Sequence, residues 1–469
     1  MAAGDNRFNR ISSKEWLPFQ KSWFVFDSKE WIRSNFRFFS TKEPSELPIL
    51  YYGNNFGDAE TQGDELGFKI VKELDGADPI QFAMIDLRAE IEELVPDEWP
   101  AFRAIWIDRI RSIADRLVHR RFLLCAMPNA EKGDSFYPYA WEMGGALGQI
   151  LSLKDEKIAC IPDPTIEGKP SLGSGIFYCL YFRKDELSGK HQSTFHQFEP
   201  GVSSFPLSAA ESVVPKWFIL RPQRRKKKEI LHPAKFPEDL PDLFISRYTT
   251  PNNNVFDPMS GTGSTQLAAV ARGRNGYGTE LSSFFAEIAR ERSLTYLFEL
   301  VKNQAELSKV PEVDIIEGDA RKVAQYGFPK QHLVFTSPPY WDMLNMKGAE
   351  NQAKRLEKGL KTNYSEDTED LGNQSDYHSF IDELCGIYRN TAELMAPEAL
   401  LVVVVKNIKK KGSNYPFAWD LAAALQPYFK LLPEVFWCQD DISIAPYGYG
   451  NTFVSNTFHQ YCLVFKKRL

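Results

Sequence analysis

The feature that most constrains the fold is the segment VFDPMSGTGST at residues 255–265. A short apolar run ends at Asp257, glycines follow at Gly261 and Gly263, and a helix-forming stretch begins directly after them. Glycine lets the backbone approach a ligand closely, and the first turn of a helix presents unpaired N–H groups. The segment therefore predicts a buried strand, a ligand-binding loop and a helix, a succession typical of the edge of a parallel α/β sheet.

Two further predicted strands also end in acidic residues, Glu280 and Asp319. Because the carboxyl ends of parallel strands meet at one edge of a doubly wound sheet, we expect these two acids and Asp257 to lie along that edge. One such acid is more often a helix cap than a ligand. Three at successive strand ends favour a nucleoside cofactor, with Glu280 well placed for ribose hydroxyls.

The fourth strand of this series leads into a turn with two prolines, HLVFTSPPYW at residues 332–341. The prolines fix the turn and remove two N–H donors, so the hydroxyl of Ser337 and the backbone carbonyls are left as acceptors. Tyr340 adds a ring on which a planar group can stack. Acceptors beside an aromatic ring suit an exocyclic amino group on a flipped base. A merely rigid turn would not explain its position at the same sheet edge.

Together, DPMSGTGS and TSPPY resemble the motifs of the S-adenosylmethionine-dependent amino-methyltransferases of DNA, over about half of the chain, residues 230–469. The serine before the prolines is similar to N4-cytosine enzymes, whereas N6-adenine enzymes more often have Asp or Asn there. Residues 231–238, LHPAKFPE, are similar to the segment that closes over the methionine part of the cofactor. One departure is the order, because many N4-cytosine enzymes have SPPY before the glycine loop.

The resemblance implies methyl transfer from S-adenosylmethionine to double-stranded DNA with a flipped target base, most simply cytosine N4, in a cytoplasmic restriction or defence setting. It implies contacts of Asp257 and the loop glycines with the methionine part, of Glu280 with the ribose and of Asp319 with the adenine amine. The predicted catalytic residues are Ser337, Pro338, Pro339 and Tyr340, and the predicted cofactor-binding residues are Lys235, Phe236, Asp257, Pro258, Gly261, Gly263, Ser264, Glu280 and Asp319. Direct transfer uses neither a cysteine nucleophile nor a metal, and we expect no metal site. N6-adenine methylation, methylation of guanine N2 or adenine N6 in RNA, and a non-catalytic nucleic-acid-binding role stay open as alternatives.

An internal repeat links the two ends of the chain. The segment YPYAWEM at 137–143 returns as YPFAWDL at 415–421, and flanking matches keep the same order at offsets of 274 and 283 residues. We therefore expect residues 100–185 to be a diverged copy of 375–467. Residues 1–205 would be a related but incomplete, degenerate α/β region, and residues 206–469 the catalytic domain, with a Rossmann-like, mostly parallel seven-stranded sheet.

The N-terminal region carries no SPPY, and its nearest candidate strand is LPILYYGN at residues 47–54. We therefore expect this copy to be catalytically inactive. Either it packs against the active half like a second subunit and helps to contact DNA, or it is plain scaffolding.

Composition limits the remaining possibilities. Of the 469 residues 43% are hydrophobic and 25% charged, which is ordinary for a globular protein, and no apolar run approaches the ~20 residues that span a bilayer. Six cysteines without a CxxC pair fit a reducing compartment and speak against a zinc finger. The net charge of −6 speaks against non-specific coating of nucleic acid. The basic runs at 221–228 and 406–411 are either solvated loops or phosphate contacts, and residues 346–361 are either a loop over the target strand or a solvated helix. The oligomeric state is left open.

Overall fold

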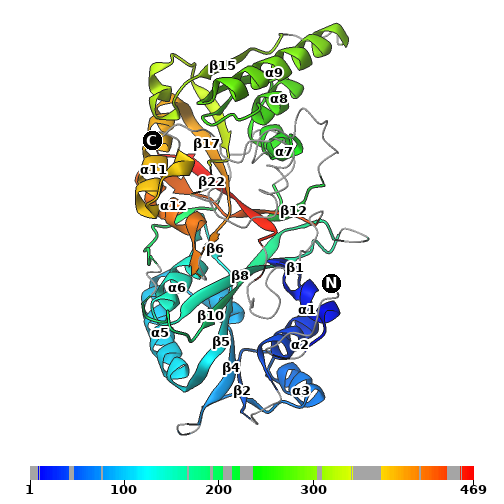
Figure 1. Cartoon of the computed structure of the whole chain (residues 1–469), viewed down its shortest axis with the longest axis vertical. Coiled ribbons are helices and arrows are strands. Elements are labelled where there is room, and N and C mark those ends of the chain that lie inside the picture. Colours follow the sequence, from blue (N-terminus) through cyan, green and yellow to red (C-terminus); the bar gives the residue numbers. More distant parts are fainter. Residues whose placement is uncertain are drawn as a thin grey trace.

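The computed structural model describes residues 9, 11–41, 47–74, 76, 78–165, 168, 170–190, 194–203, 214–221, 236–303, 309–339, 341, 371–410, 413–440, 455 and 457–468. The chain forms two α/β halves that follow one another along its long axis, each built around its own sheet (Figure 1). In the part of the chain so described, no helix combines the length and the apolar character needed to cross a membrane.

The C-terminal half contains the predicted doubly wound sheet. Its strand order is β15-β14-β13-β16-β17-β22-β21-β12-β9. The first five strands are parallel, and β22 is antiparallel to both β17 and β21. The bounds are β15 (Val313–Glu317), β14 (Asn275–Glu280), β13 (Asn254–Asp257), β16 (Gln331–Thr336), β17 (Met395–Val405), β22 (His459–Lys467), β21 (Val435–Cys438), β12 (Trp217–Ile219) and β9 (Leu172–Gly173), with β20 (Phe429–Leu431) paired to β22. This order confirms the predicted mostly parallel sheet that closes with an antiparallel strand.

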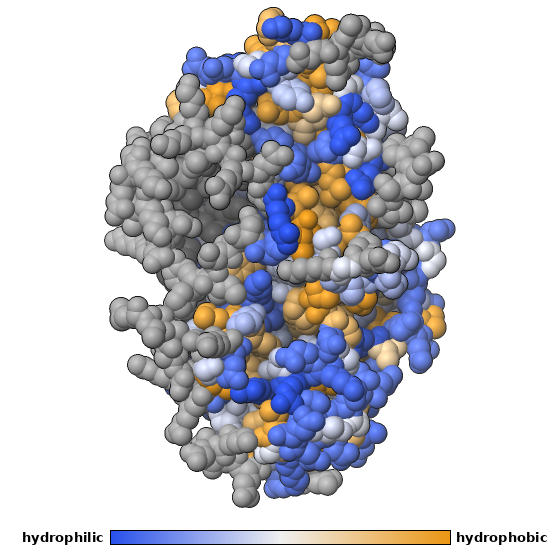
Figure 2. All heavy atoms as spheres, turned by 90° about the vertical axis from the view of Figure 1, so that its right-hand side faces the viewer, coloured by the Kyte–Doolittle hydropathy of each residue, from blue (hydrophilic) through white to orange (hydrophobic). Residues whose placement is uncertain are grey.

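Helices pack on both faces of that sheet and bury its apolar strands. They are α7 (Asp239–Tyr248), α8 (Ser264–Ala271), α9 (Ser283–Asn303), α11 (Tyr377–Leu394) and α12 (Phe417–Leu425), with the short η3 (Ala320–Gln325) and η4 (Leu371–Asn373). The central strand β17 is buried from Ala399 to Val405, as its unbroken apolar sequence requires. Helix α9 leaves apolar side chains exposed, among them Phe298 at 71%, at the end of the molecule where Figure 2 shows apolar surface among hydrophilic residues.

The N-terminal half contains a seven-stranded sheet with the order β1-β8-β10-β5-β4-β2-β3. Read from β3, the pairings are three parallel, two antiparallel and a last parallel one, which is also the succession from β14 to β12 in the C-terminal sheet. The bounds are β1 (Trp23–Val25), β2 (Ile49–Tyr52), β3 (Ile70–Val71), β4 (Ile80–Asp86), β5 (Leu117–Met127), β8 (Ser152–Ile161), β10 (Gly175–Arg183), α1 (Ser13–Phe19), α2 (Ser28–Phe39), α3 (Phe56–Leu66), α4 (Arg88–Glu93), η1 (Pro96–Glu98), α5 (Trp99–Arg116) and α6 (Tyr139–Gly148). This half is therefore more complete than the incomplete region we expected.

The two sheets correspond residue by residue along their central strands. Strand β5 lies 278 positions before β17, and each carries one non-glycine residue with positive φ at the same place, Arg120 at 64° and Glu398 at 62°. The hairpin of β6 (Ala130–Lys132) and β7 (Ser135–Tyr137), extended by β11 (Gly201–Val202), recurs as β18 (Ile408–Lys410) and β19 (Ser413–Tyr415). Because β4 pairs with β5 as β16 pairs with β17, the counterpart of the SPPY strand is β4. The predicted counterpart at 47–54 was wrong: it contains β2, which corresponds to β13.

Reciprocal contacts join the halves across an approximate twofold axis. Asn129 donates from Nδ2 to Oε1 of Glu434 at 3.1 Å, and Asn407, 278 positions later, donates to Oε1 of Glu156 at 2.8 Å. Both carboxylates are buried. The two halves therefore pack as the subunits of a symmetric dimer do.

Buried side chains also meet their own counterparts at this axis. The rings of Trp141 and Trp419 stack with centroids 6.4 Å apart and an interplanar angle of 15°. The sulfurs of Cys160 and Cys438 lie 3.8 Å apart. Self-contacts of equivalent residues are what a twofold arrangement requires.

Candidate active site at the edge of the C-terminal sheet

The glycine loop begins at Asp257, which is fully buried at the end of β13. Its carboxylate accepts the N–H of Met259 at 3.0 Å and the hydroxyl of Thr265 at 2.9 Å. Burial raises the pKa of Asp257 to about 6. The side chain thus ties the strand end to the first turn of α8, while its predicted contact with a cofactor stays a prediction.

The loop that follows uses its glycines for backbone geometry. Gly261 and Gly263 have φ values of 52° and 81°, a region that L-residues with a side chain rarely adopt. A Cβ at Gly263 would lie 3.0 Å from the Cβ of Ala289 on α9. The loop therefore requires glycine at both positions, as its sequence predicted.

The remaining described loop residues are held by neighbouring elements. The carbonyl of Pro258 accepts the hydroxyl of Thr279 at 2.6 Å, and the hydroxyl of Ser264 donates to Oε1 of Glu238 at 3.1 Å. Ser264 also lies 3.3 Å from the carbonyl oxygen of Phe236. Phe236 is therefore adjacent to the loop, whereas Lys235 lies outside the described residues.

The two other predicted acids sit at the ends of neighbouring strands. Glu280 accepts the N–H of Gly261 at 2.8 Å, so it fixes the loop on the adjacent strand. Asp319 accepts the N–H of Arg321 at 2.9 Å, caps η3 and forms an ion pair with the same arginine. The structure thus brings Glu280 into direct contact with the glycine loop and gives Asp319 a capping role, the ordinary alternative for a strand-end acid.

The SPPY turn leaves β16 beside the glycine loop, because β13 and β16 are parallel neighbours. The hydroxyl of Ser337 donates to the carbonyl of Val404 on β17 at 3.0 Å. Since this bond uses the hydroxyl proton, the lone pairs of the Ser337 oxygen remain available as acceptors. Pro338 and Pro339 follow in the turn, whereas Tyr340 and the predicted loop at 346–361 lie outside the described residues.

An aromatic cluster next to this turn was missed by the sequence analysis. Trp341 is 5% exposed, and its ring centroid lies 5.1 Å from those of both Tyr377 and Tyr415, which are themselves 5.1 Å apart. The Nζ of Lys410 lies 3.8 Å from the centroid of the Trp341 ring. A tryptophan directly after SPPY was the available signal.

The basic runs are partly accounted for by these contacts. In the run at 406–411, Lys409 bonds to Asp155, Asn407 bonds to Glu156 and Ile408 is buried, so the described part of this run is an interface rather than a solvated loop. In the run at 221–228 only Arg221 is described, and it pairs with Asp440 at 2.6 Å.

The corresponding edge of the N-terminal sheet has different chemistry. The strand registers place Tyr51 where Asp257 lies. They likewise place Asp86, Leu87 and Arg88 where Ser337, Pro338 and Pro339 lie. This half therefore lacks the buried acid of the first strand and the proline turn.

An arginine fills the place of the second proline. The guanidinium of Arg88 donates from Nε and Nη2 to Asp86 at 2.8 and 2.7 Å. It also lies 4.4, 4.7 and 4.9 Å from the rings of Phe177, Phe26 and Trp31. The place of the second proline is thus taken by an ion-paired arginine packed against three aromatic rings.

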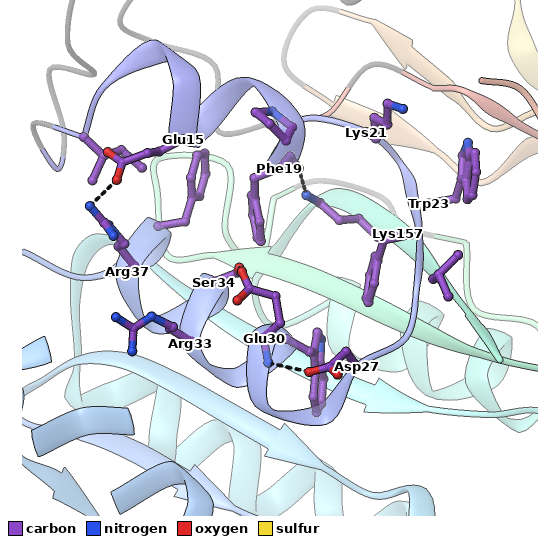
Figure 3. A pocket seen from close by; sticks show the side chains of 16 residues that line it. Glu15, Phe19, Lys21, Trp23, Asp27, Glu30, Arg33, Ser34, Arg37 and Lys157 are labelled. Atoms are coloured by element: carbon purple, nitrogen blue, oxygen red, sulfur yellow. Dashed lines mark hydrogen bonds and ion pairs between the residues drawn. The ribbon is translucent and has the colours of Figure 1, made fainter. Parts of the chain in front are cut away.

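A separate cavity of about 400 Å³ lies between α1, α2 and β1 of the N-terminal half (Figure 3). Lys157 from β8 points into it, is 4% exposed, and donates to the carbonyl of Phe19. Burial lowers the pKa of Lys157 to about 7. All residues that line this cavity belong to the N-terminal half, so it is distinct from the site at the edge of the C-terminal sheet.

Comparison with known proteins gives local matches to methyltransferases. Residues 178–291 match the N6/N4 family model described as DNA methylase, a segment that runs from β10 to within α9. The orphan methyltransferase M.BamHII of Bacillus amyloliquefaciens is 34% identical over 82 residues, which are 18% of this chain and 31% of that protein. The Type II methyltransferase M.HinfI of Haemophilus influenzae is 34% identical over 104 residues, 21% of this chain and 29% of that protein. The chain thus spans less than a third of the length of these relatives.

Solved structures give only weak likenesses. TrmN of Thermus thermophilus is 16% identical with a TM-score of 0.29, covering 49% of this chain and 48% of that one. The N-methyltransferase NodS of Bradyrhizobium japonicum is 10% identical with a TM-score of 0.27, covering 47% and 80%. Scores this low carry no argument about function. In sequence, residues 178–291, which contain the glycine loop, are thus similar to the N6/N4 amino-methyltransferases of DNA.

Proposed function

We propose that this protein is a DNA methyltransferase that transfers a methyl group from S-adenosylmethionine to the exocyclic amine of a flipped base, in the first instance cytosine N4. The observation that carries the proposal is the adjacency of β13 and β16, because it starts the glycine loop and the SPPY turn side by side at one sheet edge. The matched family model, described as DNA methylase, supports DNA as the substrate, and the relatives named as Type II methyltransferases support a restriction setting.

The loop residues fit the proposed cofactor. The Asp257 carboxyl, with its pKa of about 6, is ionised at neutral pH and favours the positive charge of a sulfonium and an amino acid ammonium. Glu280 holds the loop from the next strand, in reach of the place where a ribose would lie on that edge. When bound, S-adenosylmethionine supplies an electrophilic methyl group.

On the other side of the reaction, the SPPY turn would activate the amine. An exocyclic amine conjugated with its ring is a poor nucleophile. The Ser337 hydroxyl donates its hydrogen bond to the carbonyl of Val404, so its oxygen can act as an acceptor. This oxygen and the carbonyl of Pro338 would accept the hydrogens of the amine. The two hydrogen bonds would draw these hydrogens out of the ring plane and localise the lone pair on nitrogen. With that nitrogen in line with the methyl group, the N–C bond would form as the C–S bond breaks, S-adenosylhomocysteine would leave, and the nitrogen would lose one proton to solvent. This orientation supplies the rest of the rate enhancement.

We further assign the chemistry to residues 206–469 alone, with residues 1–205 as an inactive copy. The arginine at the place of the second proline and the tyrosine at the place of Asp257 support this division. The N-terminal half would then act as an in-built second subunit.

The direct test incubates the protein with methyl-labelled S-adenosylmethionine and unmethylated genomic DNA, followed by mass spectrometry of the nucleosides. Ser337→Ala is run beside wild type, with Asp86→Asn as the matched variant at the corresponding position of the other half. N4-methylcytosine from wild type and Asp86→Asn but not from Ser337→Ala is the expected result. N6-methyladenine would refute the choice of base. Label that appears only when cellular RNA replaces the DNA would refute the choice of substrate. A protein that binds no S-adenosylmethionine in a parallel calorimetric titration would refute the enzymatic function.

A further inference from the structure

The β18–β19 hairpin connects the N-terminal half to the SPPY turn. The hairpin follows β17, the strand that accepts the Ser337 hydroxyl. One side of it contacts β8 of the N-terminal half, and the other side contacts Trp341. A movement of β8 would therefore move the hairpin and, with it, Trp341.

The contact with β8 is made by a buried carboxylate. Asp155 is 1% exposed and accepts the Nζ of Lys409 from the hairpin. It also accepts the N–H and the hydroxyl of Ser455 at 2.7 and 2.9 Å, and Lys409 donates to the carbonyl of Ser455 at 2.8 Å. These four bonds fix the hairpin and the approach to β22 on one acid from the other half.

A second anchor lies one residue away on β8. Glu156 accepts the Nδ2 of Asn407 at 2.8 Å, and the Oδ1 of Asn407 accepts the N–H of Ala418 at the start of α12 at 2.8 Å. The hairpin is thus held at its base as well as along its first strand.

The far side of the hairpin holds Trp341. Lys410 lies over one face of the indole, and Tyr415 from β19 packs against it. Because Lys410 is adjacent to Lys409 in β18, the ion pair with Asp155 and the contact with Trp341 are made by consecutive residues. Trp341 in turn follows SPPY directly in the chain.

This link is not a by-product of the duplication. The Asn–Glu bonds occur twice by symmetry, but the residue 278 positions before Lys409 is Glu131, which pairs with the half-exposed Lys216. The residue 278 positions after Asp155 is Pro433, which has no carboxylate. Among the described residues, an ion pair between a buried acid of one half and a hairpin lysine of the other therefore forms only on the side that carries SPPY.

We propose that Asp155 is a positioning residue for methyl transfer, through which the N-terminal half holds Lys409, the hairpin and Trp341, and so fixes the turn that binds the target base. The proposal rests on the proposed function of that turn. It makes the active site dependent on the inactive half without any contact between that half and the reacting atoms.

The test replaces the ion pair by a neutral pair of similar shape, Asp155→Asn with Lys409→Met. We expect kcat/KM for DNA to fall about ten- to a hundredfold, the loss typical of a misplaced reacting group, while the Kd for S-adenosylmethionine changes less than twofold. Lys409→Arg, which keeps the charge, should restore most of the activity. Lys216→Met, which removes the ion pair of Glu131, the residue equivalent to Lys409, should behave as wild type.

A second readout does not depend on activity. In protein labelled with 5-fluorotryptophan, the Trp341 fluorine resonance, assigned with Trp341→Phe, should shift in the double variant and in Lys410→Met but not in Lys216→Met. Lys410→Met removes the contact with the indole directly, so it is the positive control for the resonance. If the double variant fails to fold, Asp155→Asn alone decides the question, because it removes the charge that holds Lys409 and leaves Lys410 in place. Unchanged kcat/KM or an unshifted resonance overturns the inference. If wild type methylates no DNA, the proposed function fails, and the resonance still decides whether Asp155 positions Trp341.

Discussion

Replacing Asp257 by Asn tests two effects of this carboxylate, the stability that its buried charge costs the folded protein and the affinity for S-adenosylmethionine that we expect it to provide. The side chain is fully buried, and burial is the main reason that its pKa is raised from 3.8 to about 6. Asn keeps the shape, and the hydroxyl of Thr265 can turn toward the carbonyl of Phe335, 3.3 Å away, and accept from the new amide. The substitution therefore removes the charge with little change in packing.

The magnitude follows from the shift. A rise of about two pKa units on folding corresponds to about 3 kcal/mol of lost stability once the group is ionised in the folded state. Because the folded pKa is the higher one, this cost is absent below about pH 4, grows as the pH rises toward 6, and is constant above. Asp257→Asn should thus match wild type near pH 4 and exceed it by about 3 kcal/mol at pH 7.

Urea denaturation of both proteins at half-unit steps from pH 4 to pH 7.5 measures this difference directly. The second half of the prediction concerns cofactor binding, measured by calorimetric titration with S-adenosylmethionine at pH 7. Asp257→Asn should bind S-adenosylmethionine about ten- to a hundredfold more weakly than wild type, which corresponds to the loss of about one charge-assisted hydrogen bond. A stability difference independent of pH would refute the raised pKa. Greater stability with unchanged affinity would show that Asp257 only ties the loop to α8.

Two further predictions concern groups outside the reaction. Lys157→Met should stabilise the protein at pH 7 by up to about 4 kcal/mol, because the amine has a pKa of about 7 in the folded state against 10.5 when exposed. The stability of wild type then rises with pH between about 7 and 10.5, so the gain seen in urea denaturation should shrink from pH 7 to pH 9.5; a gain that stays constant contradicts the buried amine. Gly278→Ala should destabilise the protein by about 1–3 kcal/mol and weaken cofactor binding, because its Cβ would lie 2.1 Å from the hydroxyl of Ser260 in the glycine loop. Gly386→Ala on helix α11 is the control, because a Cβ at this position would have no neighbour within 4 Å. It should stabilise the protein by about 0.5–1 kcal/mol. Thermal and chemical denaturation measure both variants.

Most of the C-terminal fold could be predicted from the sequence because the patterns that indicate it lie within short segments of the chain. A strand, a glycine loop and a helix follow one another between Val255 and Thr265, and Gly261 and Gly263 have the positive φ values that such a loop needs. The acids at 280 and 319 were placed at strand ends by the same local reasoning. What that reasoning could not decide is whether an acid caps or binds, and Asp319 forms both a cap and an ion pair with Arg321.

Pairing between distant segments was harder to predict. Strand β4 has no proline turn, since Asp86, Leu87 and Arg88 replace it, so its equivalence to β16 appears only in its pairing with β5. The link between Asp155 and Lys409 spans 254 residues and joins two segments that each read as an ordinary charged strand or loop. No local pattern marks a charge whose partner comes from the other half.

The interface between the halves gives the N-terminal half a structural role in this chain. Trp141 and Trp419 are both 2% exposed, and Glu156 and Glu434 are 2% and 3% exposed, because each half covers the other. Separation of the halves would hydrate two stacked indoles and leave Asn129 and Asn407 without their carboxylate partners. A free dimer has to regain this interface at the concentration of the cell, whereas a fused chain holds its halves at an effective concentration in the millimolar range. Fusion also removes the need for the two copies to stay identical, so the first copy can carry Arg88 in place of a proline turn and an anchor such as Asp155, which twofold symmetry would otherwise repeat on both sides.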